Sequence, residues 1–244
     1  MKKATQRLMK QLFSIIALSL ISTIFISCEK EEEKIEERPG KILPTVVKAE
    51  VLEEIDSIFP ERTNFLESHP ELFDVSAEKN IVLKKESEVF LTFVSEGAKY
   101  ENTLGYYIYT PSEGTVQKSN LNLQVLFPNV SDDILDQGDM LQVGDSKYPA
   151  GTVIGFFLIV RGWNSEKVDF NRETFYTNTN FNLEQQQQHV LFTFQEFNEI
   201  VLAFEDIFTS DGGDKDFNDI IFTISDNKEK STISNFDLTN VKSY

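Results

Sequence analysis

The feature that most constrains the fold is a change in hydrophobic periodicity at Asn80. From there onward, apolar residues recur at every second position in short runs, and no helical pattern interrupts them. A period of two is typical of strands that bury one face, and short strands separated by Gly, Asn and Asp turns favour a β-sandwich. We therefore predict an all-β fold for residues 80–244, a jelly-roll-like β-sandwich of about eight strands.

The runs also predict which faces are buried. The predicted strands are Ile81–Lys85, Val89–Ser95, Leu104–Thr110, Leu121–Phe127, Met140–Val143, Val153–Arg161, Thr174–Thr177, His189–Phe194, Ile200–Phe204 and Ile220–Ser225. Val153–Arg161 is apolar at nearly every position, so we expect a central strand buried on both faces. Three alternating sets are expected to face the core: Leu121, Leu123, Val125 and Phe127; Ile200, Leu202 and Phe204; and Ile220, Phe222 and Ile224.

The amino-terminal residues 1–27 have the composition of a signal peptide. A basic start is followed by an uncharged 16-residue run, Leu12–Ser27, which is shorter than the roughly 20 residues of a spanning helix. The run ends at Cys28, the only cysteine. The sequence Phe25–Cys28 resembles a bacterial lipobox, and this resemblance implies that Cys28 is acylated and becomes the first mature residue. An ordinary signal peptide with an incidental cysteine is the alternative.

Two further segments precede the predicted sandwich. Residues 28–44 form an acidic linker, whose block Glu29–Glu37 resembles the surface-export signal of Bacteroidota lipoproteins. That resemblance implies a lipid-anchored, surface-exposed protein of the outer membrane, with the periplasmic leaflet as the alternative. Residues 45–79 form a helical extension, because Thr45–Phe59 places apolar residues three and four apart; Thr45 is the expected cap, and Pro60 ends the helix.

Charge and composition exclude several functional classes. The chain has 40 acidic against 23 basic residues and a net charge of −17, which argues against nucleic acid as a partner. One cysteine and two histidines exclude a disulfide framework and most zinc sites.

The most informative segment lies between two predicted buried strands. Glu205 to Asp219 contains six acids and one base, and like charges held this close raise each other's pKa or require a cation. In an extended loop Asp214, Asp216 and Asn218 would point to one side and offer the hard oxygen ligands that calcium prefers. The preceding Gly212-Gly213 lets the backbone turn tightly. A solvated acidic turn and a catalytic carboxylate pair are the alternatives.

Other acids are candidates for the same site. Glu205 and Asp206 point to opposite faces of a strand, so we expect one of them to reach the site, and parity does not choose between them. Glu96 ends a strand and is either a ligand from a neighbouring strand or an edge carboxylate. The predicted metal-binding residues are therefore Asp214, Asp216, Asn218, Asp219, Asp206, Glu205 and Glu96. Trp163 is either part of the core rim or an exposed platform for a sugar.

The sequence FED followed by GDKDFND is similar to the signature of a bacterial extracellular domain family of unknown function, found toward the C-termini of secreted proteins. Upstream pieces that also match are Phe93–Ala98, Asn102–Tyr107, Leu126–Asn129 and Ile154–Phe157. The resemblance covers Val89–Asn227. It implies acidic positions at Glu96, Glu205, Asp206, Asp214, Asp216 and Asp219, from which enzymatic activity has been suggested.

These features predict a calcium-stabilised surface lipoprotein that acts as a non-enzymatic adhesion or glycan-binding module. Its expected partners are the outer membrane, through the lipid anchor, and a glycan or a surface protein. One alternative is a hydrolase that uses the acidic cluster as catalytic carboxylates. Another is a structural accessory subunit of an outer-membrane complex.

Overall fold

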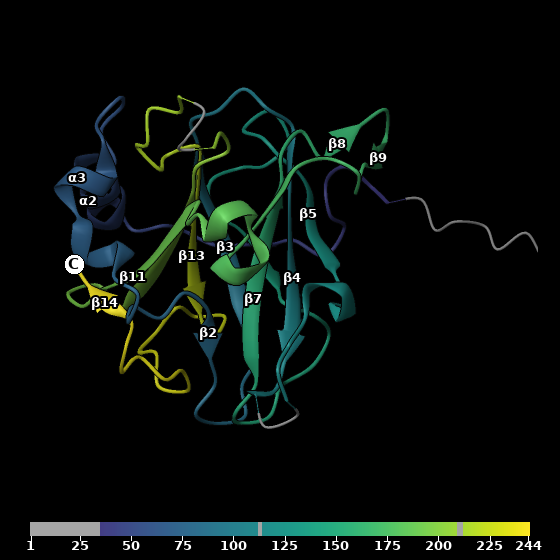
Figure 1. Ribbon diagram of the computed structural model, residues 1–244. Coiled ribbons are helices and arrows are strands. Elements are labelled where there is room, and N and C mark those ends of the chain that lie inside the picture. The colour runs from purple at the N-terminus through teal and green to yellow at the C-terminus, as the bar shows by residue number, and fades with distance from the viewer. Residues whose placement is uncertain (1–34, 112–113, 209–211) are drawn as a thin grey trace, which may run out of the picture. The chain divides into compact units, whose positions relative to one another are not determined.

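A computed structural model describes residues 35–111, 114–208 and 212–244, which form two β-sheets packed on each other (Figure 1). The larger sheet has the order β1-β6-β3-β13-β12-β11-β14, and the smaller has the order β10-β7-β4-β5 with β2 paired to β7. The larger sheet consists of β1 (Leu43–Pro44), β6 (Asp139–Gln142), β3 (Phe90–Glu96), β13 (Ile220–Ser225), β12 (Glu199–Phe204), β11 (His189–Phe194) and β14 (Lys242–Ser243). The prediction of an all-β sandwich is confirmed.

The remaining elements are short or lie outside the larger sheet. The smaller sheet consists of β10 (Thr174–Tyr176), β7 (Val153–Ile159), β4 (Asn102–Tyr109), β5 (Gln124–Val130) and β2 (Ile81–Val82), and β8 (Trp163–Asn164) pairs with β9 (Lys167–Val168). The helices are α2 (Ala49–Ile58) and α3 (Phe65–Ser68), with 3-10 turns at Pro70–Phe73, Lys118–Asn120, Thr179–Phe181 and Leu183–Gln185. Each of the ten predicted strands overlaps an observed one, whereas β1, β8, β9 and β14 were not predicted.

The core between the sheets confirms most of the predicted inward faces. Both predicted sets on β12 and β13 lie in it, together with Phe93, Leu104 and Phe127. Every residue of β7 is buried. Phe156 and Leu158 face the core, and Phe157 and Ile159 join a second cluster on the outer face of the smaller sheet. The prediction of a strand buried on both faces is confirmed.

The predicted inward face of Leu121–Phe127, a run that overlaps β5, is wrong for three of its four alternating residues. Leu121, Leu123 and Val125 pack against the outer cluster, and only Phe127 reaches the core. The pairing with β4 changes register between Leu104 and Gly105, so that one extra residue is inserted in β5. Such a bulge moves the residues that precede it to the opposite face, which strict alternation does not anticipate.

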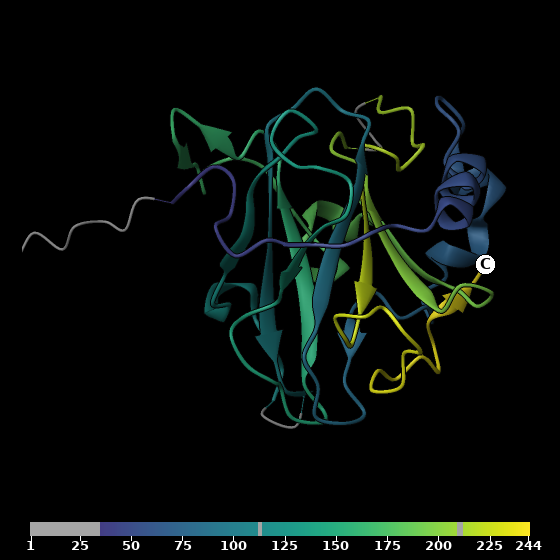
Figure 2. The ribbon, with the colours of Figure 1, turned by 180° about the vertical axis from the view of Figure 1, so that it is seen from behind.

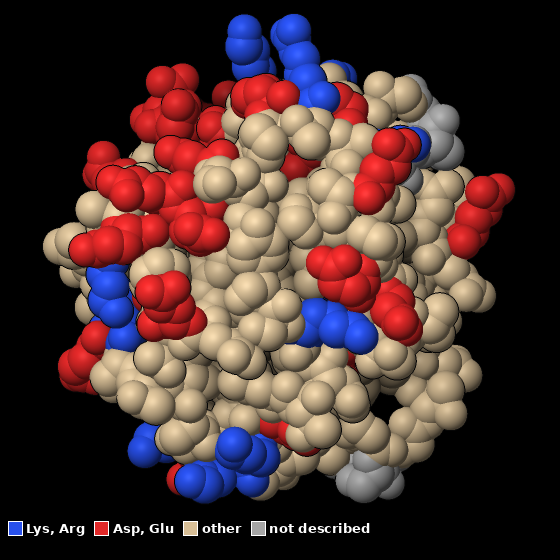
Figure 3. Space-filling view, turned by 90° about the vertical axis from the view of Figure 1, so that its left-hand side faces the viewer, with Lys and Arg blue, Asp and Glu red and all other residues tan. Residues whose placement is uncertain are grey.

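The helices form a third layer on the outer face of the larger sheet. Val51, Ile55 and Ile58 of α2 are buried against β11 and β12. On the surface of this side, acidic side chains cover much of the upper half (Figure 3). The helix begins after Lys48, not at Thr45, and no side chain caps it. The Thr45 N–H instead donates to Gly138 O at 2.9 Å, because the preceding residues belong to the sheet edge. The predicted end before Pro60 is confirmed.

The segment before α2 runs across the sandwich (Figure 2). Leu43–Pro44 pairs with β6, and Arg38 makes an ion pair with Asp139 at 2.7 Å. The last part of the predicted linker is therefore tied to the fold. Among the described residues no helix combines the length and apolar character needed to cross a membrane. Cys28 and the predicted signal peptide lie outside the described residues.

Candidate functional site

The acidic segment connects two neighbouring antiparallel strands at one end of the sandwich, and its yellow-green ribbon is at the top of Figure 1. Phe204 at the end of β12 pairs with Ile220 at the start of β13. The strands therefore fix both ends of the loop side by side, and its acids cannot spread apart. Asp211 lies outside the described residues.

Three of the predicted acids converge. Oxygen atoms of Glu205, Asp214 and Asp216 all lie within 4.8 Å of one another. Glu205 is 1% exposed and Asp216 is 2% exposed, whereas Asp214 is on the surface. Two oxygens bound to the same calcium ion are at most about 5 Å apart, since each Ca–O bond is 2.3–2.6 Å. The spacing and the oxygen donors thus fit a calcium ion.

The backbone of the loop brings these carboxylates together in a way that the extended-loop argument did not anticipate. Gly212 has a φ of +97°, and Lys215 and Phe217 have φ values of 64° and 56°. A Cβ atom at Gly213 would lie 2.5 Å from Glu205 Oε1, so a side chain there would displace the Glu205 carboxylate from its present position. Phe217 is fully buried.

Asn218 points to a different neighbourhood from that of the three acids. Its amide Nδ2 donates to Phe59 O at 3.4 Å, and its Oδ1 lies close to Gly97. The positive φ values of Lys215 and Phe217 break the strand-like alternation of side chains. That alternation was the reason for predicting that Asp214, Asp216 and Asn218 point to one side. The premise of an extended loop is therefore wrong, and the contacts of the Asn218 side chain are with Phe59 and Gly97.

The helical segment holds the loop from outside. The Arg62 N–H donates to Asp216 Oδ2 at 2.8 Å, and the Phe65 N–H donates to Lys215 O at 2.7 Å. Phe65 also packs against Phe217, with ring centroids 5.9 Å apart. Sequence analysis missed this contact because backbone donors carry no residue-type signal, and the contact joins segments about 150 residues apart in the chain.

Among the residues that the structure describes, no cationic side chain forms an ion pair with the buried carboxylates of the cluster. Burial, and then the charges of Asp214, Asp216 and Asp206, raise the pKa of Glu205 to about 7. Burial and the charge of Asp214 also raise the pKa of Asp216, against the hydrogen bond from Arg62. A bound cation would offset both effects.

Asp206 and Asp219 form a separate pair beside the cluster. The Asp206 N–H donates to Asp219 Oδ2 at 2.7 Å, and Asp206 Oδ2 accepts from Asn102 Nδ2 at 2.7 Å. Burial, followed by the charge of Asp206, raises the pKa of Asp219 to about 9. Strand alternation could not decide whether Glu205 or Asp206 reaches the site. In the structure Glu205 reaches the convergent cluster, and Asp206 faces Asn102.

Glu96 and Trp163 line a different feature, an open cleft of about 1100 Å³ at the same end of the sandwich. The Glu96 Oε2 accepts from the Asp132 N–H at 3.4 Å. Burial raises the pKa of Glu96 to about 7. Trp163 is only 6% exposed and packs in the outer cluster of the smaller sheet, so it belongs to the core rim and not to an exposed aromatic platform.

Fold and site together define an all-β sandwich with a convergent carboxylate cluster at one end. Residues 148–227 match the model of the domain of unknown function DUF4114. The match ends at the predicted Asn227 but begins well after Val89. It includes the acidic loop and excludes Glu96. Neither the curated proteins nor the solved structures contain a match to the chain.

Proposed function

We propose that this chain is a non-enzymatic binding module whose β-sandwich is stabilised by calcium at the acidic loop. The observation that carries the proposal is the convergence of Glu205, Asp214 and Asp216 within 4.8 Å, with two of the three carboxylates buried. Burying ionised carboxylates without a counter-charge is costly, and a calcium ion supplies that charge. The loop is braced on both sides, by the sheet and by Arg62, so the ligands are pre-organised.

The module acts outside the cell in this proposal, attached by lipid at Cys28 to the outer membrane of a Bacteroidota-type bacterium and exposed on its surface. Its partner is a glycan or a surface protein, and the net charge of −17 disfavours nucleic acid. Buried Trp163 removes one candidate sugar platform, so a partner would bind elsewhere on the surface. The role of an accessory subunit of an outer-membrane complex is compatible with the same site.

A binding role is favoured over hydrolysis by the location of the acids. None of Glu205, Asp206, Asp214, Asp216 and Asp219 lines the cleft of about 1100 Å³ described above. Glycoside hydrolysis needs two carboxyl groups on opposite sides of a bound substrate, whereas three oxygens that converge on one point suit a cation. Screening the purified protein against glycoside substrates, with and without calcium, tests the hydrolase alternative.

The calcium proposal is tested by thermal melting of the mature protein in calcium and in chelator. A ligand at a hundred times its Kd stabilises by about 2.7 kcal/mol, and each kcal/mol moves the Tm of a domain of this size by roughly 2–4 °C. We expect calcium to raise the Tm by roughly 5–10 °C. Asp214→Asn plus Asp216→Asn should reduce this gain, and the exposed Glu53→Gln on α2 should keep it in full. An unchanged Tm, with no heat of calcium binding, would refute the proposal.

A further inference from the structure

The cleft lined by Glu96 holds buried oxygen acceptors that the rest of the described structure leaves without donors. Asn129 on β5 is 1% exposed, and its Oδ1 has no hydrogen-bond partner among the described residues. The same holds for Glu96 Oε1 at the end of β3. Both residues line the cleft. Most buried polar atoms in proteins are hydrogen-bonded, so two orphan acceptors on one cleft indicate a missing group.

The orientation of the Asn129 amide is fixed by its neighbour. Asn129 Nδ2 donates to Glu37 Oε1 at 2.8 Å. A carboxylate only accepts, so the nitrogen must face Glu37, and the oxygen is the atom left unpaired. Glu96 is held in turn through its other oxygen by the Asp132 N–H. Both free oxygens therefore belong to side chains that are already positioned.

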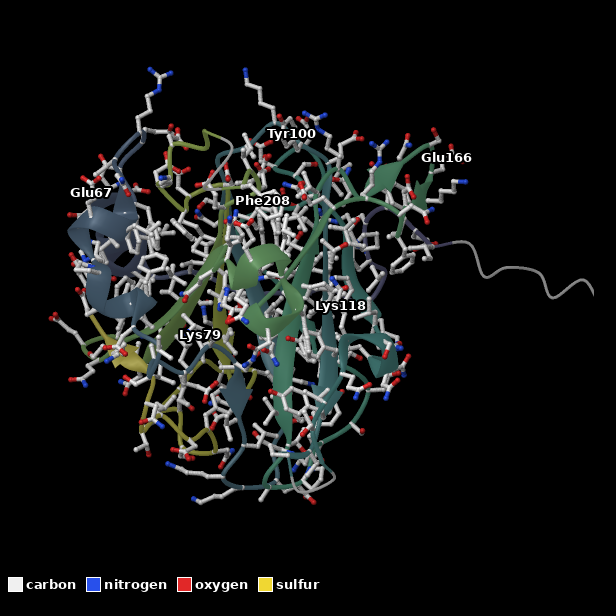
Figure 4. The ribbon with its side chains drawn as sticks, viewed as in Figure 1. Glu67, Lys79, Tyr100, Lys118, Glu166 and Phe208 are labelled. Atoms are coloured by element: carbon white, nitrogen blue, oxygen red, sulfur yellow. The ribbon has the colours of Figure 1, made fainter. Side chains whose placement is uncertain are left out.

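The charge of the cleft selects the class of ligand. Five carboxylate side chains and three cationic ones line it, a net formal charge of −2. One of the cations, Arg161, is engaged with the ring of Tyr100, 3.9 Å from its centroid, and Figure 4 places Tyr100 at the end of the sandwich. A second cation, Arg172, pairs with Asp169 at 3.2 Å. Oxygen acceptors in a net negative cleft favour a hard cation.

We propose that Asn129 Oδ1 and Glu96 Oε1 ligate a divalent, oxygen-preferring cation in this cleft, at a site distinct from the acidic loop. Glu37 and Asp132 lie beside the two ligands: Glu37 accepts from Asn129 Nδ2, and the Asp132 N–H donates to Glu96. The site joins the segment before α2, through Glu37, to both sheets, through β3 and β5. Neither ligand belongs to the span matched by the family model.

Terbium luminescence provides a test that is specific to this site. Tb³⁺ replaces calcium at oxygen sites, and its emission is sensitised by a nearby indole. Trp163 is the only tryptophan of the chain and lines the same cleft. Selective excitation of tryptophan in the mature protein should therefore give saturable Tb³⁺ emission that excess calcium suppresses. Trp163→Phe should remove the emission but leave the binding heat in calorimetry.

Substitutions at the two ligands identify the site. Glu96→Gln should weaken Tb³⁺ binding by about tenfold or more, and it should fold well because it removes an uncompensated carboxylate. Asn129→Leu should weaken binding as well, since it removes the proposed amide ligand. Asp214→Asn plus Asp216→Asn should leave the emission intact, which separates this site from the calcium loop.

Several outcomes would overturn the proposal. One is wild-type protein that binds Tb³⁺ by calorimetry without tryptophan-sensitised emission. Another is emission that disappears in the Asp214/Asp216 variant, because the signal would then belong to the loop. A third is unchanged affinity in both Glu96→Gln and Asn129→Leu. If the Tb³⁺ emission were present but calcium binding at the acidic loop did not raise the Tm, the cleft site would stand and the proposed function would be refuted.

Discussion

Replacing Glu205 by Gln tests the electrostatics of the acidic loop most directly. Its ordinary pKa is 4.5, and the folded protein raises this pKa to about 7. A difference of about 2.5 between folded and unfolded pKa corresponds to roughly 3 kcal/mol. Because the folded pKa is raised, the stabilising contribution is complete below about pH 4.5 and is lost as pH rises through about 7.

The expected result is a melting temperature that depends on pH and on calcium together. In chelator, wild type and Glu205→Gln should melt within a few degrees of each other near pH 4.5, and wild type should be lower by roughly 5–10 °C near pH 8. Calcium should restore the wild type at pH 8 and raise the melting temperature of Glu205→Gln by less. The exposed Glu53→Gln is the matched control and should follow the wild type throughout.

The comparison must be made between variants, because other groups titrate in the same range. Burial and the charge of Lys79 lower the pKa of His189 from 6.5 to about 3. As the pH falls from 6.5 to 3, His189 is protonated in the unfolded chain but stays neutral in the folded chain. The free energy of unfolding therefore falls with falling pH in that window. This opposes the effect of Glu205 but is the same in both variants. If Glu205→Gln left the difference between pH 4.5 and pH 8 unchanged in chelator, the carboxylate would not be uncompensated, and the reasoning would fail.

Three further predictions concern other parts of the chain. Cys28→Ser should move the protein from the membrane to the soluble fraction on fractionation; a variant that stays with membranes as firmly as wild type would exclude lipid at Cys28. Lys230→Met should destabilise the fold by about 3–5 kcal/mol in denaturant unfolding, because it leaves Glu199, 3% exposed and 3.4 Å from Lys230 Nζ, buried without a partner; a double variant with Glu199→Leu should recover much of the loss. Limited proteolysis followed by mass spectrometry should give a resistant core that begins near residue 35, since Arg38 and Leu43 are tied to the sheet; early cleavage between Arg38 and Thr45 would contradict this.

The elements that sequence analysis predicted well are those whose signal is local. Alternation identified β12 and β13 with their inward faces, and the unbroken apolar run identified β7 as buried on both sides. The helix was found from its apolar spacing, but its start was misplaced, because pairing of Leu43 with Met140 on β6 keeps the preceding chain extended. The two-residue strands β1, β8, β9 and β14 were missed because so short a pairing leaves no recognisable hydrophobic period.

For the candidate site, the sequence by itself determined the supply of oxygen ligands and the two strands that hold the loop. It could not determine their directions. Left-handed backbone at Lys215 and Phe217 decided that Asn218 turns away from Asp214 and Asp216. Whether Glu205 or Asp206 reaches the cluster was likewise decided by tertiary contacts, since the bond from Asn102 holds Asp206 elsewhere. Charge and spacing along a chain set which ligands are present, whereas their convergence depends on packing between residues remote in sequence.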